Sequence, residues 1–183
     1  MTIEKEPNFM ALENNIIDII KEEQIKLGYQ KETIRLYYPM ETITNLLGTD
    51  YEVAELSKVL LRFCEFVSSR LGKVVYSNVG MRFCFVIPPD GVTYVHEKVE
   101  DRYFLREFIN KISEHNCTLN EILKVFNNYS DQVICNKLKD GEFDYLIYFK
   151  DEQPDSFLYC LKFEHEHVIY HRFTRADYEK FDF

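Results

Sequence analysis

A cysteine and a histidine near the end of the chain form the most specific candidate for catalysis. Residues 157–163 and 168–173 both have the composition of β-strands, and His165-Glu166 lies midway between them. A two-residue loop there would place Cys160 opposite His171 on neighbouring strands. A cysteine beside a histidine is the minimum arrangement for a nucleophile of low pKa, so the pattern predicts a candidate site for a small hydrolase or transferase.

Packing offers a simpler explanation of the same pair. Cys160 stands between Tyr159 and Leu161 in a strand that resembles a protein core, where a reduced cysteine behaves as a small hydrophobe. A slip of one residue in register would also separate it from His171. We therefore expect Cys160 to have a structural role, and we assign a catalytic role to no residue.

The predicted loop carries two further histidines, His165 and His167, beside Glu164 and Glu166. Imidazoles and carboxylates two residues apart can bind a divalent transition metal ion. A structural site needs about four ligands and a supporting hydrogen-bond shell, which a loop tip does not supply. We expect a solvated turn, and the sequence predicts neither a metal site nor a cofactor.

His96 and Glu97 form a third candidate, because Glu100 and Asp101 follow closely. A histidine near carboxylates can act as an acid or a base at neutral pH. Such acidic residues also suit the first turn of a helix, which is predicted to begin at Asp101. The acid–base reading and the capping reading both remain open at this stage.

Tyrosines are the most prominent side chains that could bind a ligand. The sequence contains 13 tyrosines and 15 phenylalanines but no tryptophan. Because side chains alternate along a strand, the tyrosines of the last third should lie on both faces of a sheet. One face must cover helices, and the other could present an aromatic surface to a small molecule or a protein. The candidates are Tyr94, Tyr145, Tyr148, Tyr159 and Tyr170.

The elements that must position these residues form an antiparallel meander in the last third of the chain. Four runs of strand composition are separated by turn residues such as Asp140-Gly141. The predicted strands are residues 133–138, 143–149, 157–163 and 168–173. We predict an α+β fold, with several helices from upstream packed on this mainly antiparallel sheet.

Helical periodicity and end signals place the other elements. Pro88-Pro89-Asp90-Gly91 is predicted to be a turn, and residues 92–97 are left as a returning strand or a lead into the next helix. Helices are predicted at 9–27, 40–47, 50–71, 101–115 and 118–129, with a last helical turn at 175–181; extended pieces are predicted at 33–38, 73–76 and 81–87.

The predicted 50–71 helix, capped by Thr49 or Asp50, carries one apolar stripe with a spacing that also occurs in coiled coils. The stripe consists of Val53, Leu56, Leu60, Phe63 and Val67. It covers only about two heptads, and a second apolar row widens it, which is typical of a helix that packs on a core. We expect it to be buried within its own subunit.

Composition excludes several classes of protein. The net charge is −9, and the basic residues form no stripe along the sequence that could neutralise phosphates. Nucleic-acid and anionic-membrane partners are therefore not expected. The five cysteines contain no CxxC pair, and no signal peptide or 18-residue apolar stretch is present. These features predict a cytoplasmic, soluble single domain over residues 1–183, either a monomer or a weak homodimer.

Two stretches of the sequence support a family resemblance. Residues 34–48 (IRLYYPMETITNLLG) and 82–97 (RFCFVIPPDGVTYVHE) resemble an uncharacterised family of small cytosolic proteins from anaerobic Gram-positive bacteria. The resemblance implies a bacterial origin and a domain of unknown function with no assigned activity. It implies no role for any particular residue.

Two functions therefore stay open. The first is a non-enzymatic binding or regulatory protein that uses an aromatic sheet surface or groove to hold an unknown protein or small molecule. The alternative is a small hydrolase or transferase that uses Cys160 with His171, or His96 with Glu97. We favour the first, because folding accounts for nearly every patterned residue.

Overall fold

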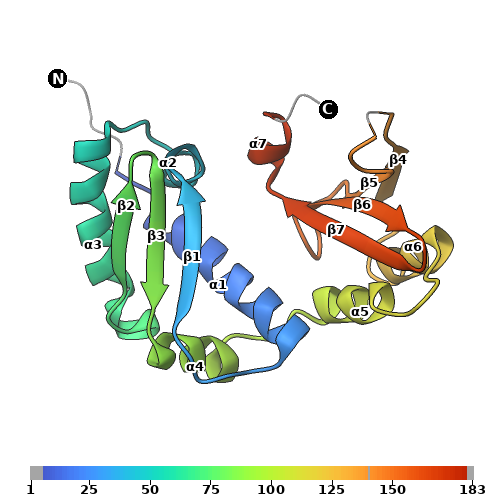
Figure 1. Ribbon diagram of the computed structural model, residues 1–183, viewed down its shortest axis with the longest axis horizontal. Coiled ribbons are helices and arrows are strands. Elements are labelled where there is room, and N and C mark those ends of the chain that lie inside the picture. The colour runs from blue at the N-terminus through green and yellow to red at the C-terminus, as the bar shows by residue number, and fades with distance from the viewer. Residues whose placement is uncertain (1–5, 140, 181–183) are drawn as a thin grey trace. The chain divides into compact units, whose positions relative to one another are not determined.

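The chain divides into two compact units, Met1–Asp101 and Arg102–Phe183. The computed structural model describes residues 6–139 and 141–180, and Figure 1 shows their helices and strands. Each unit has its own buried apolar cluster and is described by itself below. The single domain expected over residues 1–183 stays a prediction.

The first unit contains four helices and a three-stranded antiparallel sheet in its described residues. In chain order these elements are α1 (Phe9–Leu27), β1 (Ile34–Pro39), α2 (Met40–Leu47), α3 (Val53–Leu71), β2 (Val75–Val79), β3 (Arg82–Ile87) and α4 (Pro89–Lys98). The strand order is β1-β3-β2. The β2–β3 turn lies at Gly80-Met81, so β2 begins and ends later than the extended piece predicted at 73–76.

Helices α1 and α3 pack on one face of this sheet. Phe63 of α3 meets Phe85 of β3 with ring centroids 5.8 Å apart, and the Tyr38 hydroxyl of β1 donates to Asn15 Oδ1 of α1 at 2.8 Å. Strand alternation turns every second residue to the opposite face, which we call the open face. Its residues are Arg35, Tyr37, Pro39, Val75, Ser77, Val79, Arg82, Cys84 and Val86.

Four residues of the predicted apolar stripe of α3, Leu56, Leu60, Phe63 and Val67, are fully buried within the chain. The fifth, Val53, is only partly buried and packs against the same cluster. The predicted start was wrong, because Glu52 rather than Thr49 or Asp50 is the N-cap. The Glu55 carboxylate accepts the Glu52 N–H at 3.3 Å. This interaction satisfies a backbone donor that would otherwise lack a partner within the helix.

The turn predicted at residues 88–91 is wrong, and of the alternatives left open for residues 92–97 the strand is excluded, because α4 occupies both segments. Pro88 is extended and Pro89 is the first helical residue, where a fixed φ and a missing N–H suit a helix start. Gly91 serves close packing instead of a turn, because a Cβ there would lie 2.3 Å from the Leu71 carbonyl oxygen. The proline pair therefore opens a helix.

The second unit contains the predicted C-terminal meander. Its elements are α5 (Tyr103–Ile112), α6 (Leu119–Asn127), β4 (Val133–Lys137), β5 (Tyr145–Phe149), β6 (Leu158–Glu164), β7 (His167–Phe173) and α7 (Arg175–Tyr178). The strands are antiparallel in the order β4-β5-β6-β7 (Figure 1). The α+β class and the meander are thus confirmed. Asp140 of the predicted turn and Phe181 of the predicted last helix lie outside the described residues.

Helices α5 and α6 cover one face of the meander. Phe108 of α5 lies 4.8 Å from Tyr159 of β6, and Phe126 of α6 lies 5.0 Å from Phe149 of β5, both measured between ring centroids. The opposite face buries a separate cluster that includes Leu146. Strands β5 and β6 therefore bury apolar side chains on both of their faces, which explains why these two strands are rich in large apolar residues.

Candidate functional site

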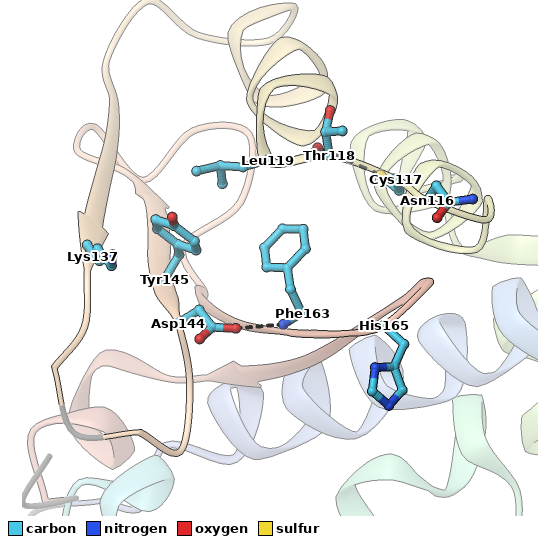
Figure 2. A pocket seen from close by; sticks show the side chains of 9 residues that line it. All are labelled: Asn116, Cys117, Thr118, Leu119, Lys137, Asp144, Tyr145, Phe163 and His165. Carbon is cyan, nitrogen blue, oxygen red and sulfur yellow. Dashed lines mark hydrogen bonds between the residues drawn. The ribbon is translucent and has the colours of Figure 1, made fainter.

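An open pocket of about 560 Å³ lies in the second unit. It is bounded by the α5–α6 connection, the ends of β4 and β6, the start of β5 and the β6–β7 turn (Figure 2). Its lining residues are Asn116, Cys117, Thr118, Leu119, Lys137, Asp144, Tyr145, Phe163 and His165.

Two aromatic rings form its apolar wall. Tyr145 pairs with Leu161 across β5 and β6, so Phe163, two residues further along β6, lies on the same face as Tyr145. The ring centroids are 5.9 Å apart, and the rings stand at 89° to each other. Phe163 stands in the middle of the pocket, with Leu119 on the far side of the space (Figure 2).

Asp144 holds this wall in place. Its carboxylate accepts the Phe163 N–H at 2.7 Å, and its own N–H donates to the Leu161 carbonyl at 2.7 Å. A hydrogen bond to a carboxylate is stronger than one between neutral groups. Asp144 thus ties β5 to β6 beside Phe163, while a carboxylate remains on the pocket surface.

The opposite rim is tied to the β6–β7 turn. Asn116 has a φ of 59°, and its N–H donates to the Glu166 carbonyl at 3.0 Å. A capping box at Thr118 begins α6: the Glu121 carboxylate accepts the Thr118 hydroxyl at 2.6 Å and the Thr118 N–H at 2.8 Å. These bonds lower the pKa of Glu121.

Cys117 also lines the pocket but is unsuited to nucleophilic chemistry. Burial raises the pKa of the Cys117 thiol, and the nearby charge of Glu121 raises it further. A thiol with a raised pKa is neutral at pH 7 and reacts slowly. Cys117 therefore contributes a small apolar surface to the pocket.

The tyrosines proposed from the sequence lie in different places. Tyr145 lines the pocket, whereas Tyr148 packs against the buried cluster on the other face of the meander. Tyr159 is fully buried, and Tyr170 packs against Phe108 at 5.1 Å. Tyr94 belongs to α4 of the first unit. Tyr145 is the one member of the set that lines this pocket.

The predicted pairing of Cys160 with His171 is present in the β6–β7 register. Cys160 is fully buried in the cluster with Leu146, Leu158 and Phe173. Alternation places it on the face away from Phe163. This position supports packing as the role of Cys160.

Alkylation provides a test of that role. We expect iodoacetamide at neutral pH to label Cys160 no faster in the folded protein than in the unfolded chain, because the folded strand excludes the reagent. His171→Ala should leave the rate unchanged, and the exposed Cys135 is the internal control for active reagent. Fast labelling of folded Cys160 that disappears in His171→Ala would make the pair a catalytic candidate again.

The remaining histidine candidates are exposed. His96 lies in the last turn of α4 beside Glu97 and stacks on Tyr29, with ring centroids 4.1 Å apart and planes within 7°. His165 reaches the pocket rim, and the His167 ring lies 5.2 Å from that of His115. The described residues contain no group of three or more His, Cys, Asp or Glu side chains that could hold a metal ion.

Sequence reasoning named Tyr145 and His165 but missed the other pocket residues. Lys137 and Asp144 look like ordinary polar ends of strands. Thr118 begins the predicted 118–129 helix, yet the start of a helix does not reveal that the preceding loop bonds to Glu166. The β6–β7 hairpin and the Thr118 cap were the two available signals.

Comparison with known proteins gives a family without a function. No curated protein and no solved structure matches the chain. Residues 9–181 match a family model described as a domain of unknown function, "E. rectale Gene description". That species is an anaerobic Gram-positive gut bacterium. Because the match spans nearly the whole sequence, including both units, the chain belongs to the DUF3877 family.

Proposed function

We propose that this protein is a non-enzymatic binding or regulatory protein whose second unit holds a small ligand in the pocket at Phe163. The observation that supports this most is the pair of perpendicular rings, Tyr145 and Phe163, in the wall of an open pocket. Ligand sites in proteins are typically apolar and aromatic, with a few polar groups that fix orientation. Asp144 and Lys137 provide such groups here.

The charges favour a ligand with one flat apolar part and one anionic part. Lys137 is exposed and forms no ion pair in the described part of the chain, so its ammonium group is available to a bound anion. Asp144 already accepts the Phe163 N–H. A planar group lying against Phe163 would bury apolar surface. An aromatic carboxylate combines both properties.

Enzyme chemistry receives less support from the same residues. Cys160 is fully buried, and the pKa of Cys117 is raised. His96 and Glu97 belong to the first unit and lie at an exposed helix end. The hydrolase or transferase alternative thus has no nucleophile–base pair among these candidates that is open to a substrate.

The cellular setting is part of the same proposal. We propose a bacterial, cytoplasmic protein that is monomeric or weakly dimeric. The net charge of −9 argues against nucleic acid and anionic membranes as its partners. No helix in residues 6–139 or 141–180 is long and apolar enough to cross a membrane.

Titration with simple probes tests the pocket. We expect 4-hydroxyphenylacetate to shift backbone amide signals of residues 116–119 and 144–145 in ¹⁵N-labelled protein, and tyramine, its amine counterpart, to shift them much less. Phe163→Ala should weaken binding by about tenfold, because the ring supplies most of the apolar contact, on the order of 1.4 kcal/mol. Lys137→Met should remove the preference for the carboxylate.

Ile169→Ala is the matched control, because Ile169 is a half-exposed residue on the opposite face of the same hairpin. It should leave the titration unchanged. If each probe shifts these amide signals as much in Phe163→Ala as in the unaltered protein, the pocket is not built around this ring.

A further inference from the structure

The open face of the β1-β3-β2 sheet combines exposed apolar side chains with positive charge. Tyr37 is 64% exposed, Val75 is 47% exposed and Val79 is 88% exposed. Arg35 and Arg82 lie at opposite ends of the same face, and both are exposed. Large apolar side chains gathered on one exposed surface mark a contact site more often than isolated ones do.

The charge of this face is opposite to that of the chain. Its strand positions include two arginines and no aspartate or glutamate, whereas the whole sequence carries 31 acidic and 22 basic residues. Within residues 6–139 and 141–180, neither the Arg35 side chain nor the Arg82 side chain takes part in a hydrogen bond or an ion pair. Both guanidinium groups are therefore available to carboxylates, which they bind through paired hydrogen bonds.

The register fixes the distance between the two charges. Arg35 pairs with Val86, four residues from Arg82 along β3. At a rise of about 3.3 Å per residue, the two arginine positions are separated by about 13 Å along the strands. Tyr37 and Cys84 pair with each other between them. An extended peptide with carboxylates at positions i and i+4 has the same spacing.

The size of the face excludes a large rigid interface. Three strands at about 4.8 Å spacing and five residues at about 3.3 Å rise give a footprint of about 240 Å². A stable dimer buries about 800 Å² on each partner. A short segment matches the footprint, whereas a second copy of the chain does not.

We propose that the open face docks a short acidic segment of a partner protein, with two carboxylates on Arg35 and Arg82 and an apolar side chain on Tyr37 between them. Aliphatic residues such as Val75 and Val79 favour protein over nucleic acid, because only the single ring of Tyr37 could stack on a base. This surface belongs to the first unit and is independent of the pocket at Phe163.

A pair of charge-matched peptides tests the proposal on the full chain. In ¹⁵N-labelled protein, Gly-Glu-Thr-Val-Thr-Glu-Gly should shift the amide signals of β1, β2 and β3, and the same peptide with lysines in place of glutamates should not. Arg82→Glu should weaken binding of the acidic peptide by roughly tenfold and strengthen binding of the basic peptide, because it reverses one contacting charge.

Lys58→Glu is the matched control, since it makes the same charge change at an exposed position of α3, and it should leave both titrations unchanged. Unaltered signals outside the open face show that each variant is folded. The proposal is overturned if the acidic peptide produces no shift, or if both peptides bind equally. It is also overturned if oligouridylate shifts these amides or if protein concentration alone does so, since these results indicate RNA or a second copy.

Discussion

Asp155→Ala is expected to lower the free energy of unfolding of the second unit by about 3–5 kcal/mol, the usual cost of breaking a buried ion pair. The Asp155 carboxylate accepts the Tyr159 hydroxyl at 2.8 Å and the Phe157 N–H at 2.9 Å, and it lies 3.5 Å from the Arg172 guanidinium. The Arg172 side chain is 4% exposed. Removing the carboxylate would leave that charge buried without this counter-ion.

Urea denaturation followed at amides of the meander measures this loss. Glu114→Ala is the control, because it removes a carboxylate from the more exposed Lys111–Glu114 pair, where a much smaller loss of stability is expected. If Asp155→Ala costs no more than the control, the buried pair does not stabilise the unit.

Leu60→Ala should lower the stability of the first unit by about 2–5 kcal/mol, because it opens a cavity beneath α3. Leu60 is fully buried in the cluster that joins α1, α3 and the β1-β3-β2 sheet. The neighbouring Leu61 is 60% exposed. Leu61→Ala therefore makes the same chemical change at the surface and should cost less than about 0.5 kcal/mol.

Sedimentation and urea denaturation distinguish burial of the α3 stripe within the chain from its use as an interface between subunits. Burial within the chain predicts a loss of stability at every protein concentration in Leu60→Ala. A change confined to self-association, with unchanged monomer stability, would show that the stripe is an interface between subunits.

Patterns of short range were enough to predict most of the fold. The end of α1 at Leu27, the bounds of α2 and the register of Cys160 with His171 follow from caps, periodicity and a two-residue loop. The Pro88–Gly91 segment was misread because its turn-like composition also suits a helix start. The decisive contact, Gly91 against the Leu71 carbonyl, joins residues distant in sequence.

The candidate site depends on such distant contacts even more. Tyr145 and Phe163 share a face through the β5–β6 pairing. The connection between these strands, residues 150–157, is too long for a turn type to predict that pairing. The Asn116 N–H reaches the Glu166 carbonyl across the fold of the second unit. Local propensity contains no information about these meetings, so the sequence suggested individual tyrosines without showing which of them borders a pocket.

The edges of the two sheets have consequences for aggregation. An edge strand offers free backbone groups that can pair with another molecule, and charged residues or prolines normally block this. Among the described edge strands, β1 contains Arg35 and Pro39, β4 contains Lys137, and β7 contains Arg172. Strand β2, Val-Tyr-Ser-Asn-Val, contains neither a charged residue nor a proline. Its length of only five residues is then its main protection against unwanted pairing with another molecule.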